Sequence, residues 1–592
     1  MSFVRSSLQY SSAVTKRLFL LALALLISQF ALGQGITTGS ITGTVEDQQQ
    51  QVIPNATVTA IQNGTNTSFG AKTNSVGSFE IRGLPVGSYN ITIEATGFSK
   101  VQISNVATNA GRATSVGART LGIASSQESV TVEATAPILQ TDTMQIGESF
   151  ETKKLADLPV GNGLDIVTLF TPGVVPAGDS GFSNQGGAQF AANGQRARDN
   201  NFQLDGQSNN DTSIGGPVIF FGNQDAVAEV QVLTNYSAEY GRNTGTVVNY
   251  ITKAGTNSLH GTAFEIYNGN WGDSLANQDK SPLFGICPKG VALGTATDFS
   301  ASCTSPVVPR NVDNRFGGTL GGPVLKDRVW FFGSGNFERV RTGPTLASSG
   351  GQLTPTANGL AQLAAAFPGN SAVAALKAVG PLSVKKGILT VGASQMLPVN
   401  GVPIEFATIT RNVDAISNDY EGSGRVDYQL SQNDKIFGRY YYQKQLFTNI
   451  ASADLASVAA GQFVDVPSRT YQAGVDWAHT FSPMFINQAR FSYSNSTVGF
   501  ENGGFPDCNR ANFSQCPTQV IFLDNSLGFG ETTGFPQGRD VINYQVQDNA
   551  TRQVGTHSIK FGGEFQRQRQ PNFFLPNSAG LFTFSCFATC GA

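Results

Sequence analysis

The feature that most constrains the fold is a strand-length alternation of apolar and polar residues in the second half of the chain. Within residues 470–481 the apolar positions are Tyr471, Ala473, Val475, Trp477 and Phe481, and the polar positions are Gln472, Gly474, Asp476 and Thr480. Successive side chains of a β-strand point to opposite faces, so such a strand has one apolar and one polar face. The pattern recurs in residues 425–430, 436–442, 485–493 and 559–566. Long strands of this kind are typical of a membrane-spanning β-barrel.

The composition supports this interpretation. Charged residues make up only 13% of the chain, whereas 67 glycines, 41 phenylalanines and 14 tyrosines favour strands joined by turns over a helical bundle. The formal net charge of −3 provides no basic field, so nucleic acid is excluded as a partner.

The first 33 residues have the pattern of a secretory signal peptide. Basic residues precede the ten apolar residues 18–27, and the small-x-small sequence 31–33 predicts cleavage between Gly33 and Gln34. The apolar run is shorter than the ~20 residues of a transmembrane helix. We therefore expect an exported chain without a helical span, which a β-barrel alone could place in a membrane.

The six cysteines form three local pairs. The pairs are Cys287 with Cys303, Cys508 with Cys516, and Cys586 with Cys590. In an oxidising compartment this spacing predicts three small disulfide loops. Metal binding is the alternative, but no pair has CxxC spacing and the three histidines lie far apart, so no metal or cofactor site is predicted.

The sequence of residues 34–122 predicts a small antiparallel β-sandwich. Gly43, the segment Pro54-x-Ala56-x-Val58 and the run from Gly77 to Tyr89 resemble the carboxypeptidase regulatory-like domain. The resemblance implies an immunoglobulin-like, carbohydrate-binding-like fold without peptidase activity. Glycan binding would follow from fold analogy alone.

Residues 123–135 form a linker with an extended, β-prone heptapeptide. Its residues are Glu128, Ser129, Val130, Thr131, Val132, Glu133 and Ala134. The heptapeptide resembles a TonB box, which implies a TonB-type energy-coupling protein in the periplasm as partner. A free strand of this kind could add to the edge of a partner's sheet. The alternative is that it forms the last strand of the sandwich.

Residues 136–257 resemble the plug domain of TonB-dependent transporters. Four motifs occur in the order found in that family: residues 164–174, residues 193–206 with a turn at Asp205-Gly206, residues 230–241, and residues 245–255. The tetrapeptide GDSG at 178–181 copies a protease motif. No histidine precedes His260, however, so the required order of catalytic residues is missing and no enzyme is predicted.

Residues 314–332 resemble the Oar-like subgroup of TonB-dependent outer-membrane proteins. The resemblance implies a non-enzymatic receptor in the outer membrane of a Gram-negative envelope, surrounded by lipid, with the sandwich in the periplasm. The solute would be large or scarce: a carbohydrate, a peptide or a chelate. The alternatives are an outer-membrane adhesion or assembly protein and a secreted carbohydrate-binding protein.

The expected fold is mainly β: signal peptide, sandwich, plug and a transmembrane barrel from residue 258. Barrels of this family have 22 strands, which need roughly 220 residues at about ten per strand before loops are counted. Residues 258–592 number 592 − 257 = 335, so we expect the N-terminal part of a barrel. A complete small barrel is the alternative.

A plug must be seated and yet movable, so we expect ion pairs between plug and barrel. Arg196, Arg198 and Arg242 lie in plug motifs, and Glu564 lies on the polar face of the strand at 559–566. The prediction is that at least one of these arginines pairs with a lumen-facing acid, with Glu564 as the first candidate.

Overall fold

The computed structural model describes most of the chain after the leader. The described residues are 37–123, 130–133, 146–158, 164–177, 190–213, 215–241, 244–272, 311–342, 352–450, 463–482, 484–505, 507–508, 516–522, 528–530, 536–554, 557–574 and 580–584. The predicted cleavage site at Gly33 and Gln34 lies outside them. Four of the cysteines also lie outside them: Cys287, Cys303, Cys586 and Cys590. Of the predicted disulfides, Cys508–Cys516 is formed.

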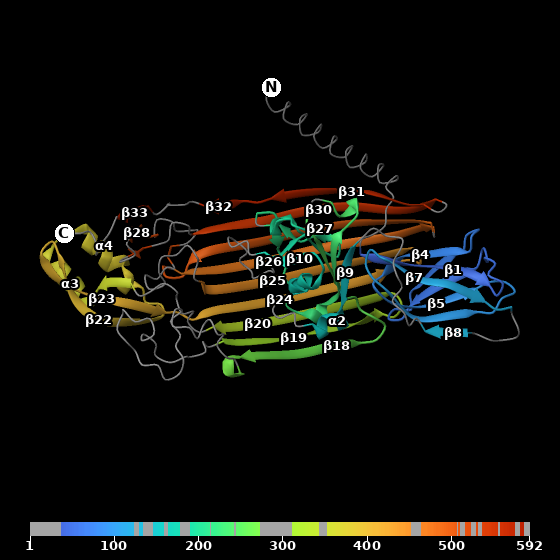
Figure 1. Cartoon of the computed structure of the whole chain (residues 1–592), viewed down its shortest axis with the longest axis horizontal. Coiled ribbons are helices and arrows are strands. Elements are labelled where there is room, and N and C mark those ends of the chain that lie inside the picture. The colour runs from blue at the N-terminus through green and yellow to red at the C-terminus, as the bar shows by residue number, and fades with distance from the viewer. Residues whose placement is uncertain are drawn as a thin grey trace, which may run out of the picture.

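A β-sandwich lies at one end of the molecule (Figure 1). Its strands are β1 (Thr38–Asp47), β2 (Thr57–Gln62), β3 (Ser68–Lys72), β4 (Ser78–Pro85), β5 (Gly87–Glu94), β6 (Val101–Thr108), β7 (Ala113–Leu121) and β8 (Val130–Glu133). The two sheets have the orders β4-β1-β7 and β3-β2-β5-β6-β8. Ile41, Phe79 and Ile91 lie in their common core. The phenol of Tyr89 lies in that core and donates to the Pro85 carbonyl at 2.7 Å.

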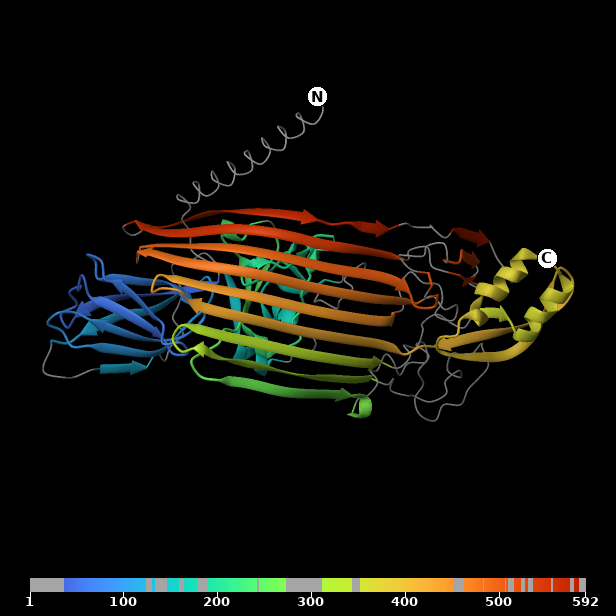
Figure 2. The same cartoon turned by 180° about the vertical axis from the view of Figure 1, so that it is seen from behind.

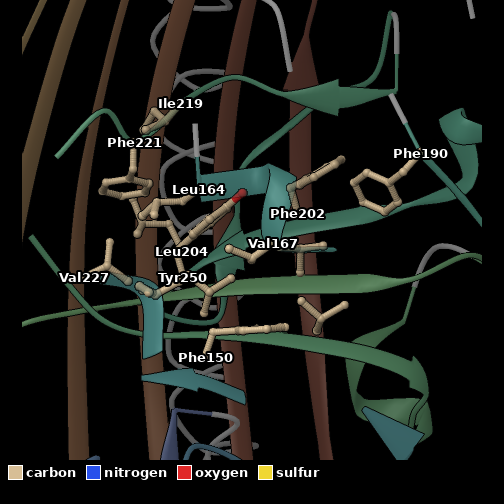
Figure 3. Close-up of a cluster of buried hydrophobic side chains, with 14 of the residues drawn as sticks. Phe150, Leu164, Val167, Phe190, Phe202, Leu204, Ile219, Phe221, Val227 and Tyr250 are labelled. Atoms are coloured by element: carbon tan, nitrogen blue, oxygen red, sulfur yellow. The ribbon is translucent and has the colours of Figure 1, made fainter. Parts of the chain in front are cut away.

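A second unit, here called the inner domain, comprises the described residues from 146 to 252. Its elements are β9 (Ile146–Glu151), α2 (Thr152–Asp157), η2 (Leu164–Phe170), β10 (Val174–Pro176), β11 (Phe190–Ala192), η3 (Ala197–Asp199), β12 (Asn201–Leu204), β13 (Gln207–Ser208), β14 (Asn210–Asp211), β15 (Gly216–Pro217), η4 (Gln224–Ala226), β16 (Val227–Asn235), η5 (Ala238–Tyr240) and β17 (Val247–Thr252). The main sheet has the order β13-β12-β17-β16-β9. Phe150, Leu164 and Phe202 belong to its apolar core (Figure 3).

The largest element is an antiparallel sheet of long strands, here called the large sheet. Its strands are β18 (His260–Gly269), β19 (Asn311–Leu325), β20 (Val329–Thr342), β24 (Ala415–Gln429), β25 (Asp434–Ile450), β26 (Val464–Ser482), β27 (Phe485–Asn502), β30 (Gln537–Val554) and β31 (His557–Arg569), with β32 (Asn572–Phe574) beside β30. The inner domain lies against one face of this sheet and the sandwich at one end (Figures 1 and 2). Among the described residues, the edge strands β18 and β31 do not pair with each other.

The two faces of the large sheet follow the predicted alternation. Val475, Phe491 and Val546 are 46–51% exposed on one face. On the other face, Gln472, Arg490 and Gln545 are buried, at 0–3% exposure. Within the described part of the chain, no helix combines the length and the apolar character needed to cross a membrane.

Two further regions lie at the end of the large sheet opposite the sandwich (Figures 1 and 2). The first, here called the helical loop, contains β21 (Gln352–Pro355), α3 (Ala357–Ala366), α4 (Ser371–Val379), η8 (Pro381–Ser383), β22 (Ile388–Val399) and β23 (Val402–Asn412). The second region, here called the small sheet, contains β28 (Gln519–Phe522), β29 (Gly528–Phe529) and β33 (Leu581–Phe584). The core of the helical loop is apolar and includes Leu363, Ile404 and Phe406.

Candidate functional site

The candidate site is the contact between the inner domain and the polar face of the large sheet, and Asp205 lies at its centre. Asp205 and Gly206 join β12 to β13 with φ values of +49° and +74°, a left-handed pair that suits a tight hairpin turn. The Asp205 amide donates to the Tyr250 carbonyl at 2.8 Å. Its carboxylate accepts from the amide and from the hydroxyl of Thr252, both at 2.8 Å. The turn predicted at Asp-Gly therefore carries a rigidly held carboxylate.

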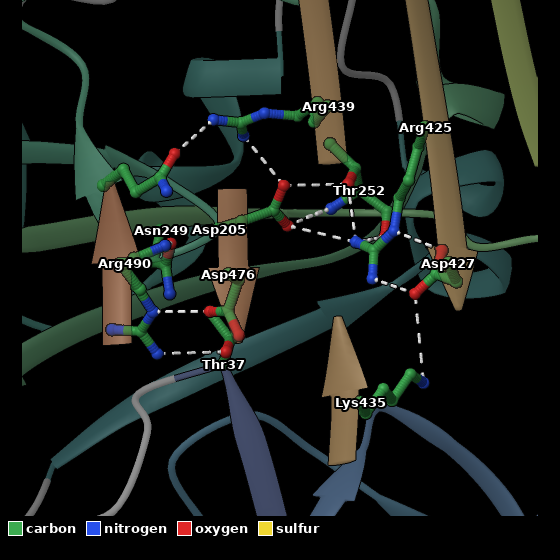
Figure 4. A network of polar contacts seen from close by, with 12 residues as sticks. Thr37, Asp205, Asn249, Thr252, Arg425, Asp427, Lys435, Arg439, Asp476 and Arg490 are labelled. Carbon is green, nitrogen blue, oxygen red and sulfur yellow. Dashed lines mark hydrogen bonds and ion pairs between the residues drawn. The ribbon is translucent and has the colours of Figure 1, made fainter. Parts of the chain in front are cut away.

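Two arginines of the large sheet meet this carboxylate (Figure 4). Arg439 on β25 donates from Nη1 to Asp205 Oδ2 at 2.7 Å and from Nη2 to Gln207 Oε1 at 2.8 Å. Arg425 on β24 lies 3.7 Å from Asp205 Oδ1 and donates to the Thr252 hydroxyl at 2.9 Å. The side chains of Asp205 and Arg439 are each only 1% exposed. A buried pair of this kind strongly penalises loss of one partner, because the other charge is left uncompensated.

A second layer of charges on the large sheet orients Arg425. Asp427 accepts two hydrogen bonds from Arg425, at 2.8 and 2.9 Å, in a bidentate arrangement. Lys435 lies 3.9 Å from Asp427 Oδ1, and the Phe437 ring centre lies 3.9 Å from the Arg425 guanidinium. The planar fork of an arginine suits both contacts, which a lysine could not make together.

A neighbouring pair connects the same surface to the sandwich. Arg490 donates to Asp476 at 2.7 Å and to the hydroxyl of Thr37 at 3.2 Å, and Gln488 also reaches that hydroxyl at 3.2 Å. Thr37 directly precedes β1 of the sandwich. Arg425, Lys435, Arg439 and Arg490 carry four positive charges against three on Asp205, Asp427 and Asp476, a net of +1. The buried charges are therefore nearly balanced.

Further contacts spread along the inner domain, and most of them are polar. Asp211 on β14 pairs with Arg539 on β30 at 2.7 Å. The Gly222 amide donates to Glu421 at 2.8 Å, and the Gln443 amide group donates to the Phe220 carbonyl at 3.0 Å. The exception is Tyr441, the one large-sheet residue in the inner-domain core cluster of the described residues. The polar contacts can be exchanged for contacts with water, whereas an apolar interface could not.

The sandwich also contacts the inner domain, at Ala110 in the turn between β6 and β7. The Ala110 amide donates to Glu229 at 3.1 Å, and its carbonyl accepts from Gln231 at 2.6 Å. Glu229 on β16 is fully buried. Burial raises the pKa of the Glu229 carboxyl, and hydrogen bonds from Ser149 and from the Ala110 amide offset part of that rise. The two units therefore share a buried titratable group.

Two of the residues predicted for plug–barrel ion pairs, Arg196 and Glu564, contact neighbours within their own units. Arg196 pairs with Asp199 of the inner domain at 3.3 Å, and Arg198 lies exposed in η3. Glu564 accepts from Gln547 of the adjacent strand at 2.8 Å. Arg242 lies outside the described residues. The buried pairs that the structure shows have the opposite polarity, because the inner domain supplies the acids and the large sheet supplies the arginines. The predicted turn at Asp205-Gly206 could have pointed to this acid as a functional residue. The arginines that pair with it, however, lie more than 200 residues away in sequence.

The TonB-box-like segment is described in part. Val130–Glu133 form β8, which pairs in parallel with β6, and Val101 is the partner of Val130. This is the arrangement that the sequence left open as a last strand of the sandwich. Glu128, Ser129 and Ala134 lie outside the described residues.

Two family models match the chain. Residues 251–591 match the model described as an outer membrane beta barrel domain, and residues 40–122 match the carboxypeptidase regulatory-like domain. The second match confirms the resemblance found in the N-terminal motifs.

Proteins similar to this chain in sequence or fold include two transporters and one siderophore receptor. The TonB-dependent transporter Oar of Myxococcus xanthus is 27% identical over 321 residues, which are 52% of this chain and 27% of Oar. The outer membrane transporter YddB of Escherichia coli is 12% identical with a TM-score of 0.45 over 71% of this chain. The siderophore receptor PirA of Acinetobacter baumannii is 14% identical with a TM-score of 0.41 over 72% of this chain. The chain spans 48% of each of these two solved chains. Because the barrel model covers more than half of the 592 residues, the protein belongs to the outer membrane β-barrel family, is located in the outer membrane, and carries a carboxypeptidase regulatory-like domain.

Proposed function

We propose that the protein is a TonB-dependent outer-membrane receptor in which the inner domain acts as a plug and moves to admit a solute. The observation that carries the proposal is the contact of Asp205 with Arg439 and Arg425 on the polar face of the large sheet. Buried ion pairs hold a domain strongly while both partners are present, yet hydration can replace them once the domain is displaced. The proposal involves no covalent chemistry.

The position of the sandwich gives the direction of the pull. In a receptor of this kind the sandwich end faces the periplasm, and the helical loop and small sheet face the outside. Thr37 and Ala110 tie the sandwich to the large sheet and to the inner domain. A force applied next to the sandwich would therefore reach the inner domain through contacts that the structure describes.

The force would be applied at β8, which contains the central four residues of the box. β8 is the last strand of its sheet, and the edge that it pairs with β6 cannot pair with a partner's sheet at the same time. Pairing through four residues leaves few hydrogen bonds to break. The proposal is that the TonB-type protein adds a strand to this inner edge, so that β8 leaves β6 and the segment becomes free to be pulled.

A disulfide between β6 and β8 tests this requirement. Gln102 and Thr131 are partners in the strand register, so Gln102→Cys with Thr131→Cys should join the strands when oxidised. We expect the oxidised variant to lose binding to the C-terminal domain of a TonB-type protein, measured by surface plasmon resonance, and to regain it on reduction.

The matched control joins β2 to β3 through Thr57→Cys and Lys72→Cys, a pair in register on the other edge of the same sheet. This disulfide should leave binding unchanged. Equal binding by the oxidised and reduced forms of the β6–β8 variant would contradict the proposed role of β8. Loss of binding in the control would show that the sandwich itself, rather than the released strand, is the contact.

A further inference from the structure

A cavity of about 820 Å³ lies between the helical loop and the small sheet, at the end of the molecule away from the sandwich. One wall is formed by α3, α4 and β23, and the other by Pro517, Thr518, Val520, Phe529 and Phe582. We propose that this cavity binds a small, uncharged, apolar molecule. That this molecule belongs to the class of solute taken up rests on the proposed receptor function. Cavities of roughly 300–1,000 Å³ are the usual size of small-molecule sites.

The chemistry of the lining selects the class of ligand. Its aromatic residues are Phe367, Phe406, Phe529 and Phe582, and none of the described lining residues is charged. An ionised ligand would lose its hydration here without gaining a counter-charge from those residues, which is strongly unfavourable. An apolar molecule would gain the free energy of burying its surface against the rings. The lining therefore favours a hydrocarbon-like solute over an anionic chelate.

The cavity is held open by helix α4. Val373, Leu376 and Val379 share the face of α4 that lines the cavity, and each is only partly buried. None of the residues of α4 is fully buried. The Asn370 side chain caps the helix by accepting from the Ala372 and Val373 amides, which fixes the orientation of this face. Because α4 leaves apolar surface uncovered, an apolar ligand can complete its packing.

Each wall contributes one firmly packed ring. Phe406 on β23 is 1% exposed and Phe529 on β29 is 8% exposed, whereas Phe582 on β33 is 60% exposed. The buried rings supply a fixed floor, and Phe582 lies at the open side. An approaching molecule could therefore enter past Phe582 without disturbing the core of the helical loop.

Photolabelling with benzophenone, an uncharged apolar probe, tests the proposal. The full chain would be reconstituted in phospholipid nanodiscs, irradiated with increasing benzophenone, and mapped by peptide mass spectrometry. We expect saturable labelling of peptides from residues 367–379 and 517–529. Labelling that rises linearly up to the solubility limit, or that is confined to the strands of the large sheet, would overturn the proposal.

Two substitutions on α4 should remove the labelling. Leu376→Glu places a carboxylate in the cavity, and Ala375→Phe fills it with an apolar ring that preserves the composition of the wall. Each should lower saturable labelling by about tenfold or more, because a charge or a steric block excludes the probe. The matched control Ala374→Glu changes an exposed residue of the same helix outside the lining, and it should label as wild type.

The occupant and the proposed function are tested separately. A neutral diacylphospholipid or a peptide copy of residues 523–527 or 575–579 that abolished labelling would make lipid or the chain itself the occupant, against the proposal. No TonB-type protein is present in the assay. Failure of labelling would therefore contradict the apolar site alone, whereas failure of the disulfide experiment on β8 would contradict the receptor function alone.

Discussion

The polar face of the large sheet and the cavity between the helical loop and the small sheet are lined by side chains of opposite chemical character. Against the inner domain, the sheet uses buried arginines and acids such as Arg439, Arg425 and Asp427. The cavity between the helical loop and the small sheet is lined mainly by aromatic and aliphatic side chains with a few uncharged polar ones, and no charged residue is found among those described. The difference fits the two proposed roles. A plug domain that moves would need contacts that water can replace, whereas a site for an apolar molecule would need contacts that water cannot replace.

The largest effect is expected for Arg439→Ala. It leaves the buried Asp205 carboxylate without its nearest cation. The free energy of association between the inner domain and the large sheet should therefore become less favourable by about 3–5 kcal/mol. The measurement is the urea dependence of cysteine labelling in Ser208→Cys, a buried position beside the turn.

Two further variants sharpen this test. Adding Asp205→Asn to Arg439→Ala should recover part of the loss, because the uncompensated charge is removed and Asn tolerates the left-handed backbone. Arg196→Ala breaks an exposed pair and should change the free energy of association between the inner domain and the large sheet by only about 0–1 kcal/mol. If Arg439→Ala and Arg196→Ala had equal effects, the contrast between buried and exposed pairs would be lost.

A somewhat smaller effect is expected for Leu363→Ala in the helical loop. Leu363 is 6% exposed and packs with Ile404 and Phe406, so truncation should cost about 2–4 kcal/mol of local stability. Hydrogen exchange of the β23 amides would measure the loss. Because the contact is apolar, the loss should be the same in low and high salt; a strong salt dependence would contradict the contrast with the polar face of the large sheet.

The contact between Glu229 and Ala110 should depend on pH. The pKa of Glu229 is raised in the folded protein, so its contribution to stability is fully present below the ordinary carboxyl pKa and is lost as the pH rises through the raised value. Exchange of the Ala110 amide, corrected for the intrinsic rate, should accelerate over that range. Glu229→Gln keeps an acceptor for the Ala110 amide and should remove the pH dependence of its exchange. If the pH dependence were the same in this variant, a group other than Glu229 would be responsible for it.

The smallest effect is expected at the partly exposed pair between Lys560 on β31 and Glu239 of the inner domain, 3.3 Å apart. Lys560→Ala should change the free energy of association between the inner domain and the large sheet by about 0–1 kcal/mol at low salt. Pairs near the surface are screened by solvent and cost side-chain entropy. In 1 M salt, where the screening length is about 3 Å, the difference should vanish. A persistent difference would show that this pair acts through packing, which would weaken the distinction between buried and exposed charges.

Much of the architecture could be predicted because it depends on local patterns. The alternation in residues 470–481 correctly predicted which side of β26 is apolar, and the Asp-Gly pair correctly predicted the turn between β12 and β13. The plug–barrel pairs could not be assigned in this way. Arg196 has an acid three residues away, so a local pair competes with any distant one, whereas Asp205 and Arg439 are 234 residues apart.

The sequence by itself determined the strands, their two faces, the sandwich motifs and the family, because each depends on residue types at spacings of a few positions. Only the tertiary structure decided which carboxylate faces which guanidinium, that Val130–Glu133 pairs with β6, and that α4 and the small sheet enclose one cavity. These outcomes depend on the order and register of strands far apart in the chain. A change of one residue in register moves a side chain to the other face of the sheet, so composition and local spacing alone could not determine them.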